Sequence, residues 1–262
     1  MNPIEQVSET WKRHWEESGM RPDLSLRGRV LRHYLASMGG MSSTRYVLSV
    51  LKRELGEVKG LEILDAGSGT GLNSLALSAR GASITLLDIS PRALEIAKVY
   101  YDEQKLLAKA IEGSIFSLPF ADESFDVVWN TGVIEHFEPE DRKRALKEML
   151  RVMKPKGALI TLNPYAYAKI YRYAKEIAEK RGTWDVGFEL PIDTLGDDID
   201  LDRYILTERA EGWFLQFHFL KYLLPGKSRI LFVAFHEFLQ NFLNFLNRYP
   251  GYLLTSVIRR RT

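Results

Sequence analysis

Three glycines that alternate with small residues follow directly after a short apolar run. The run ends at Asp65, and Gly67, Gly69 and Gly71 come next. Glycine costs little at positive φ and carries no Cβ, so a ligand can approach such a backbone closely. Leu72 to Arg80 then has the apolar spacing of a helix, whose first amide groups would point back at the turn. A strand, a glycine turn and a helix in this order form a cradle for a small ligand.

Acidic residues around this turn indicate which ligand it holds. A dinucleotide fingerprint needs a third glycine three residues after the second, and Leu72 occupies that position here. Asp65 precedes the glycines, and Asp88 ends the next apolar run. Because ligands of open α/β sheets bind outside the carboxyl ends of the strands, both carboxylates are expected at one crevice. Asp88 can accept both ribose hydroxyls, and Asp65 can receive an ammonium group or orient the loop. The alternative for Asp88 alone is a cap for the helix that starts at Pro91.

Asp65 to Gly71 resembles the first motif of the class I S-adenosylmethionine-dependent methyltransferases, and Asp88 is similar to their ribose-binding acid. Further segments resemble the fourth strand of that family and the helix, turn and fifth strand that follow it: Phe125 to Asn130, Leu146 to Gly157 and Ala158 to Leu162. The resemblance extends over roughly residues 58 to 163, in order and with ordinary spacing. It implies S-adenosylmethionine as the cofactor.

The fold implied by this resemblance is α/β, a doubly wound, mostly parallel and Rossmann-like sheet of seven strands. N-terminal helices and a helical insertion after the fifth strand would be added to it. Independently, the alternation of strands and helices over 58–163 favours a parallel sheet. We predict an N-terminal helical cap over 1–57 and a methyltransferase domain over 58–262, with 164–212 as a substrate lid.

The remaining elements are expected from apolar spacing and from glycine and proline breaks. Helices are predicted at Glu5 to Ser18, Leu26 to Met38, Ser43 to Leu55, Tyr165 to Lys180 and Ser228 to Tyr249, and another short helix should end at Gly212. The last two strands, Phe214 to Leu220 and Gly251 to Ile258, should pair antiparallel at the edge of the sheet, as the resemblance implies.

Residue roles can be carried over onto matching positions. The predicted cofactor-binding residues are Asp65, Gly67, Ser68, Gly69, Asp88, Ile89, Ser114, Ile115 and Asn130. The glycines would face the methionyl part, Ile89 would pack on the adenine, and Asn130 would lie beside the methyl group. Many relatives have an acid where Ser114 stands. A serine hydroxyl can accept the same bond from adenine, but without charge assistance.

The pair Glu135 and His136 lies just beyond the predicted fourth strand. Histidine has an unperturbed pKa that suits proton removal near neutrality, so His136 is the predicted catalytic base. Similar pairs in the family often serve the architecture of the loop, and that role stays open. A methyl group on a sulfonium is already activated, so orienting the acceptor supplies much of the catalysis.

Aromatic residues gather where the acceptor is expected. Residues 213 to 252 contain eight of the 13 phenylalanines, which is compatible with core, an acceptor pocket, a dimer contact or a membrane surface. Predicted substrate residues are Tyr34, Tyr165 and Tyr167, with Trp11 and Trp15 closing the crevice from the other side. These residues favour a small, apolar or aromatic acceptor. The alternatives are a methyltransferase of protein or nucleic acid, a non-catalytic cofactor-binding module, and an NAD-dependent oxidoreductase, which Asp65 and Leu72 disfavour.

The amino-acid composition disfavours or excludes some classes of protein and some kinds of site. An apolar share of 45% and a charged share of 27% are typical of a globular protein, and a net charge of +2 does not indicate nucleic-acid binding. The chain has no cysteine, so disulfides and thiolate metal sites are excluded. Five aspartates lack the spacing of a calcium loop and are expected to form a solvated loop without a metal: Asp193, Asp197, Asp198, Asp200 and Asp202.

Nothing in the sequence resembles a signal peptide or a run of apolar residues long enough to cross a bilayer. We therefore expect a cytoplasmic enzyme without a transmembrane segment. Its partner would be a small-molecule acceptor, and the aromatic C-terminal helix is a candidate contact for a homo-oligomer.

Overall fold

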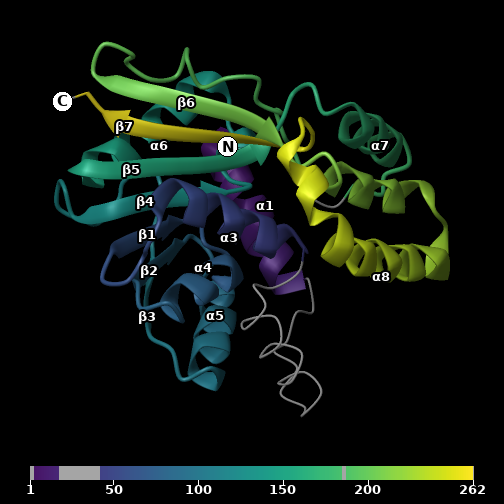
Figure 1. The fold of residues 1–262 in the computed structure, drawn as a ribbon, viewed down its shortest axis with the longest axis horizontal. Coiled ribbons are helices and arrows are strands. Elements are labelled where there is room, and N and C mark those ends of the chain that lie inside the picture. Colours follow the sequence, from purple (N-terminus) through teal and green to yellow (C-terminus); the bar gives the residue numbers. More distant parts are fainter. Residues whose placement is uncertain (1–2, 18–41, 185–186, 262) are drawn as a thin grey trace.

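The computed structural model describes residues 3–17, 42–184 and 187–261. Seven strands form one sheet in this part of the chain: β1 Glu62–Ala66, β2 Ser83–Asp88, β3 Ala108–Glu112, β4 Phe125–Thr131, β5 Met153–Pro164, β6 Tyr204–Glu211 and β7 Leu253–Arg260. Their order across the sheet is β3-β2-β1-β4-β5-β7-β6 (Figure 1). The first five strands pair in parallel, and β7 runs antiparallel to both β5 and β6. The expected doubly wound, mostly parallel sheet is confirmed.

Helices cover both faces of this sheet. The α-helices are α1 Pro3–Glu17, α3 Ser42–Leu55, α4 Leu72–Ser78, α5 Pro91–Glu103, α6 Pro139–Val152, α7 Lys169–Lys180 and α8 Gly226–Leu243. Three 3₁₀ segments add to them: η1 Ile134–His136, η2 Leu215–Leu223 and η3 Asn244–Arg248. The helix predicted at Leu26 to Met38 lies outside the described residues.

Two apolar cores lie on opposite sides of the strands. Successive strand residues point to opposite faces, so Trp129 joins the core beneath α3, α4 and α5, whereas Val128 joins the core beneath α6. Both side chains are fully buried. Helix α5 begins at Pro91 behind Ser90, whose hydroxyl accepts from the Ala93 amide at 3.3 Å, a normal helix cap. Ser90, and not Asp88, therefore provides this cap through its side chain.

The C-terminal part differs from the prediction in one strand. The prediction of a strand at Phe214 to Leu220 is wrong, because most of this segment belongs to the 3₁₀ segment η2. The edge strand of the sheet is β6, in the region where a short helix was expected to end. The segment does not pair with a strand, because its aromatic side chains pack on α7. The ring centroids of Phe219 and Tyr171 lie 4.8 Å apart. The antiparallel final strand is confirmed as β7. The predicted lid region, 164–212, thus includes β6, and its role as a lid stays a prediction.

The acidic loop is not wholly solvated. Asp198 is buried, and its carboxylate pairs with the Arg142 guanidinium of α6 at 2.6 Å, so the expectation is wrong for this residue. Among the described helices, none is long and apolar enough to cross a bilayer.

Candidate functional site

The turn after β1 needs its glycines for conformation and for space. Gly67, Gly69 and Gly71 have φ values of 82°, 52° and 65°, in the left-handed region that side chains rarely adopt. A Cβ on Gly69 would lie 2.9 Å from Cζ2 of Trp15, and one on Gly67 would lie 2.8 Å from Cγ2 of Val133. The backbone of this turn is therefore closely packed on both sides.

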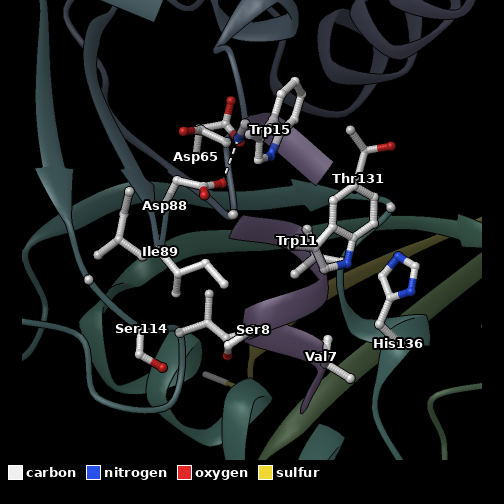
Figure 2. Close-up of a pocket in the computed structure, with 18 of the residues that line it drawn as sticks. Val7, Ser8, Trp11, Trp15, Asp65, Asp88, Ile89, Ser114, Thr131 and His136 are labelled. Carbon is white, nitrogen blue, oxygen red and sulfur yellow. Dashed lines mark hydrogen bonds between the residues drawn. The ribbon is translucent and has the colours of Figure 1, made fainter. Parts of the chain in front are cut away.

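A cavity of about 400 Å³ lies at the carboxyl ends of β1 and β2, a size typical of small-ligand sites. The glycine turn forms one wall, and α1 crosses the opening with Val7, Ser8, Trp11 and Trp15 (Figure 2). The other lining residues are Asp65, Gly67, Ser68, Gly69, Thr70, Leu72, Asn73, Leu87, Asp88, Ile89, Gly113, Ser114, Ile115, Phe116, Thr131, Gly132, Val133, His136 and Phe137.

Asp88 connects the glycine turn to α5. One carboxylate oxygen accepts from the Gly69 amide at 2.8 Å, and the other accepts from the Ser90 amide at 2.9 Å. Burial raises the pKa of this carboxyl, although the backbone hydrogen bonds oppose the shift. Each carboxylate oxygen can accept more than one hydrogen bond, so Asp88 can still take ligand hydroxyls at the cavity wall.

Asp65 lies deeper, at the end of β1. It accepts from the Ser74 hydroxyl at 2.7 Å, and Ser74 in turn accepts from the Trp129 indole at 3.2 Å. Burial, with a smaller contribution from the Asp88 charge, raises the pKa of Asp65 to about 7. A cation in the cavity would favour the ionised carboxylate, because an opposite charge lowers the pKa of a buried carboxyl.

Ser68 and Ser114 supply two further polar groups at the cavity wall. The Ser68 hydroxyl is buried and has no hydrogen-bond partner among the described residues, so it can donate to an anionic group. The hydroxyl of Ser114 accepts from the Phe116 amide at 3.2 Å and thereby shapes the turn after β3. Ile89 and Ile115 supply apolar surface between these polar ends.

His136 has one ring nitrogen fixed and the other unused. Its Nδ1 is hydrogen-bonded to the Phe188 carbonyl oxygen, and since a carbonyl only accepts, Nδ1 carries the proton. Nε2 is buried without a hydrogen-bond partner in the described part of the chain. Burial also lowers the pKa of His136, which keeps the ring neutral near pH 7. Nε2 thus carries no proton and lies 4.0 Å from Oε1 of Glu135, and the rings of His136 and Trp11 have centroids 5.0 Å apart (Figure 2).

A second cavity of about 440 Å³ lies next to the first. The two share four lining residues, Val7, Trp11, His136 and Phe137. The rest of the second lining is Gln6, Thr10, Glu138, Asp141, Gly187 and Phe188. Trp11 and His136 therefore stand at the boundary between the two cavities.

Glu135, His136 and Glu189 are all buried and each has a ligand-type atom within 4.8 Å of the others. Glu189 accepts from the Tyr171 hydroxyl at 2.6 Å, and burial raises the pKa of Glu135 well above its usual value. The hydrogen bond from Tyr171 gives Glu189 a partner within the protein, and the absence of a metal at these three residues stays a prediction.

The structure brings most of the predicted site residues to the first cavity: Asp65, Gly67, Ser68, Gly69, Asp88, Ile89, Ser114, Ile115 and His136. Asn130 does not line it. Side chains alternate along β4, so Asn130 faces α6, where its amide donates to Sδ of Met149 at 3.4 Å. Thr131 and Gly132 line the cavity in its place.

Of the predicted substrate tyrosines, the two in the described part of the chain line neither cavity. Tyr165 packs on the core beneath α6, and its ring lies 5.4 Å from that of Tyr167, which is 63% exposed. Tyr34 lies outside the described residues. No predicted substrate tyrosine is therefore placed at the site.

Sequence reasoning missed Val7, Ser8 and Phe188. Val7 was detectable, because Val7, Trp11 and Trp15 recur every four residues and so share one face of α1. Phe188 acts through its backbone carbonyl, and no sequence pattern marks such a contact. Its segment has neither helix nor strand periodicity.

Residues 64–161 match the family described as methyltransferase domain. A demethylmenaquinone methyltransferase of Renibacterium salmoninarum is 34% identical over 57% of this chain and 59% of that protein. The mitochondrial ubiquinone biosynthesis O-methyltransferase of Schizosaccharomyces pombe is 32% identical over 61% of this chain and 54% of that protein. The chain thus spans less than two thirds of the length of these curated relatives.

The likeness in fold extends further than the likeness in sequence. The magnesium protoporphyrin IX methyltransferase of Synechocystis PCC 6803, solved with S-adenosylmethionine bound, superposes over 99% of this chain and 98% of that chain with a TM-score of 0.57 and 13% identity. At this identity the likeness concerns the fold alone. The chain is thus similar to the methyltransferase domain family over residues 64–161, and its fold is shared with a solved methyltransferase.

Proposed function

We propose that this protein is an S-adenosylmethionine-dependent methyltransferase whose acceptor is a small, apolar or aromatic molecule. One observation carries the proposal: two buried carboxylates and an unused hydroxyl meet around the glycine turn at a single cavity. Asp65 would take the ammonium group, Ser68 the carboxylate and Asp88 the ribose hydroxyls. Ile89 and Ile115 would hold the adenine by apolar contact.

When bound, the cofactor supplies a methyl group on a sulfonium, which is an activated electrophile. The protein then has to orient the acceptor, exclude water and remove a proton where the acceptor carries one. His136 would take that proton at Nε2, because Nδ1–H is held by the Phe188 carbonyl. Trp11 and Trp15 of α1 cover the cavity and would exclude water from it.

The second cavity is the proposed acceptor site. It adjoins the first at Trp11 and His136, so an acceptor hydroxyl placed there could reach Nε2. Val7, Trp11 and Phe137 supply aromatic and apolar contacts. The names of the two curated relatives, for demethylmenaquinone and for ubiquinone biosynthesis, support a ring of the quinol type with an apolar substituent.

The predicted helical cap and lid are part of the same proposal. α1, within 1–57, lines both cavities, and Gly187 and Phe188, within 164–212, line the second. Trp11→Ala should raise the KM of the acceptor more than that of the cofactor, which steady-state kinetics would measure. A cytoplasmic location also belongs to the proposal, and fractionation of the source cells would test it.

Binding is tested first, by calorimetric titration with S-adenosylmethionine, S-adenosylhomocysteine and NAD. S-adenosylmethionine and S-adenosylhomocysteine should bind, and NAD should not. Asp88→Ala should weaken the binding of S-adenosylmethionine by about 100-fold, while Asp102→Ala, which removes an exposed carboxyl on α5, should leave it unchanged. Binding of NAD alone would instead identify an oxidoreductase.

Turnover is tested second, with methyl-labelled S-adenosylmethionine. Naphthoquinols and catechols should accept the label, and glycine, a mixed peptide pool and DNA should not. Label in the peptide or DNA fraction alone would replace the small-molecule proposal with a macromolecular one. If the protein binds the cofactor but transfers no label to any metabolite extract, it is a non-catalytic cofactor-binding module.

A further inference from the structure

Helix α8 and η3 expose apolar side chains and bury polar ones. A row of residues spaced by four and three positions lies at the surface, each between 47% and 73% exposed: Leu231, Phe235, Phe238, Phe242, Phe245 and Tyr249. We refer to this row as the aromatic stripe. The side facing the protein carries His236, Gln240 and Asn247, all buried. A surface helix normally has the opposite arrangement.

Specific polar contacts fix the rotation of this segment. The Asn247 side chain accepts from the amides of Phe214 and Leu215 at 2.9 and 3.0 Å. His236 stacks on the Phe214 ring with centroids 4.9 Å apart, and its Nε2 lies 3.2 Å from the Phe214 carbonyl oxygen. These contacts hold α8 and η3 against η2 by their polar side, so the aromatic stripe is directed outward.

Charge around the stripe has one predominant sign. Residues 213 to 252 contain four basic residues and one acidic residue, Glu237. Arg248 lies 5.2 Å from the Tyr249 ring at one end of the stripe, whereas Arg229 lies 5.5 Å from the buried Tyr222 ring and donates to the Lys221 carbonyl oxygen, so it faces η2. Basic side chains beside an aromatic face are typical of helices that lie in the headgroup layer of an anionic bilayer.

A second copy of the chain fits this surface less well. The spacing of the stripe is that of a coiled-coil seam, but the α-helix ends at Leu243 and η3 continues with 3₁₀ geometry. Only Leu231, Phe235, Phe238 and Phe242 lie on continuous α-helix, about half of the three to four heptads that indicate a coiled coil. Such seams also prefer leucine and β-branched residues, whereas three of these four positions are phenylalanine.

We propose that α8 and η3 dock this protein on the surface of an anionic bilayer, with the aromatic stripe in the headgroup layer and the helix parallel to the membrane. α8 lies beyond the ends of β5 and β6, on the side of the sheet where α1 also lies (Figure 1). Docking would therefore bring the bilayer to the side of the molecule that carries the two cavities. That last consequence rests on the proposed function, whereas the docking itself does not.

Flotation with lipid vesicles tests the docking in the absence of cofactor and acceptor. The full chain should float with vesicles of phosphatidylcholine and phosphatidylglycerol, and at least tenfold less with phosphatidylcholine alone. Raising the salt concentration should weaken the interaction, because surface charges are screened. The triple variant Phe235→Ser, Phe238→Ser, Phe242→Ser should lose flotation at least tenfold, and Arg248→Glu should reduce it severalfold.

A matched control carries Leu107→Ser and Leu201→Ser, which remove exposed apolar side chains away from α8 and should leave flotation unchanged. The far-UV circular dichroism spectrum and the midpoint of thermal unfolding should be the same in the triple variant and the parent chain, which establishes that the variant folds. No flotation of the parent chain with anionic vesicles would overturn the proposal. A parent dimer in light scattering that the triple variant converts to monomer, without vesicle binding, would assign the stripe to a second copy.

Discussion

The cavity at β1 and β2 and the outer face of α8 use polar and apolar side chains in opposite ways. At the cavity, Asp65 and Asp88 are buried, and each is held by hydrogen bonds from neighbouring residues. On α8, phenylalanines face outward while His236 and Gln240 are buried. A buried carboxylate is costly unless a partner compensates it, and an exposed aromatic row is costly unless something covers it. The first region thus fits a small polar ligand, and the second fits a large apolar surface.

Replacing His136 should have the largest effect and would separate chemistry from binding at the cavity. His136→Gln removes the lone pair at Nε2, so kcat should fall by about 10²–10⁴-fold, the usual contribution of a positioned base. Calorimetry should give an unchanged affinity for S-adenosylmethionine. Because burial lowers the pKa of His136, the parent rate should decline only at pH values below its ordinary 6.5. A kcat within threefold of the parent would reduce His136 to a structural role.

Asp88 tests whether the buried carboxylates serve the ligand. Asp88→Ala removes bonds to Gly69 and Ser90 together with the proposed ribose contact. Hydrogen bonds to charged groups are worth about 1.5–3 kcal/mol each, so the Kd for S-adenosylmethionine should rise by about 100-fold. Calorimetric titration measures the change, with Asp102→Ala as the control. Equal affinities in the two variants would contradict the role given to Asp88.

The alternation of strands and helices over 58–163 and the position of the cavity were predictable because local sequence encodes them. Buried runs end at Asp65 and Asp88, and the carboxyl ends of parallel strands meet at one edge. β6 was not predictable in this way. Edge strands are partly exposed, and Thr207, Glu208 and Arg209 give β6 a polar sequence, whereas the aromatic sequence of η2 is typical of a strand.

Contacts between segments that are distant in the chain also could not be predicted from the sequence. The carbonyl of Phe188 fixes the tautomer of His136, and the two residues are 52 positions apart. Asn130 and Thr131 differ by one position, but strand alternation directs only Thr131 to the cavity. The end of β4 could not be located to one residue from its apolar pattern, so the choice between these two could not be made.

The pH dependence of binding tests whether Asp65 meets a cation. The pKa of Asp65 is raised to about 7 by burial, so below pH 7 a proton competes with the ligand ammonium group. The affinity for S-adenosylmethionine should therefore fall by up to about tenfold per pH unit from pH 7 down to pH 5, and level off above pH 7. Calorimetry across this range measures it.

Two controls sharpen that measurement. Methylthioadenosine lacks the amino acid part, so its affinity should not follow the titration of Asp65. Asp65→Asn should remove the slope for S-adenosylmethionine. A slope that persists in this variant would assign the titration to another group.

The smallest effect is expected on α8. Leu231 is 73% exposed, so Leu231→Ala should change the free energy of unfolding by no more than about 0.5 kcal/mol. The same substitution at Leu64, fully buried in β1, should cost about 2–5 kcal/mol. Urea denaturation of both variants gives the two values. A large decrease in the free energy of unfolding for Leu231→Ala would mean that Leu231 stabilises the fold itself and is not available to a docking surface.

The contact of Trp15 with Gly69 has a consequence for the kinetic order of the reaction. In the proposed function α1 lines both the cofactor cavity and the acceptor cavity, so a nucleoside would leave only after the acceptor site is vacated and α1 moves. We therefore expect compulsory-order turnover, in which the nucleoside enters first and its demethylated form departs last. The residence time of that product, set by the opening of one helix, would then limit the steady-state rate.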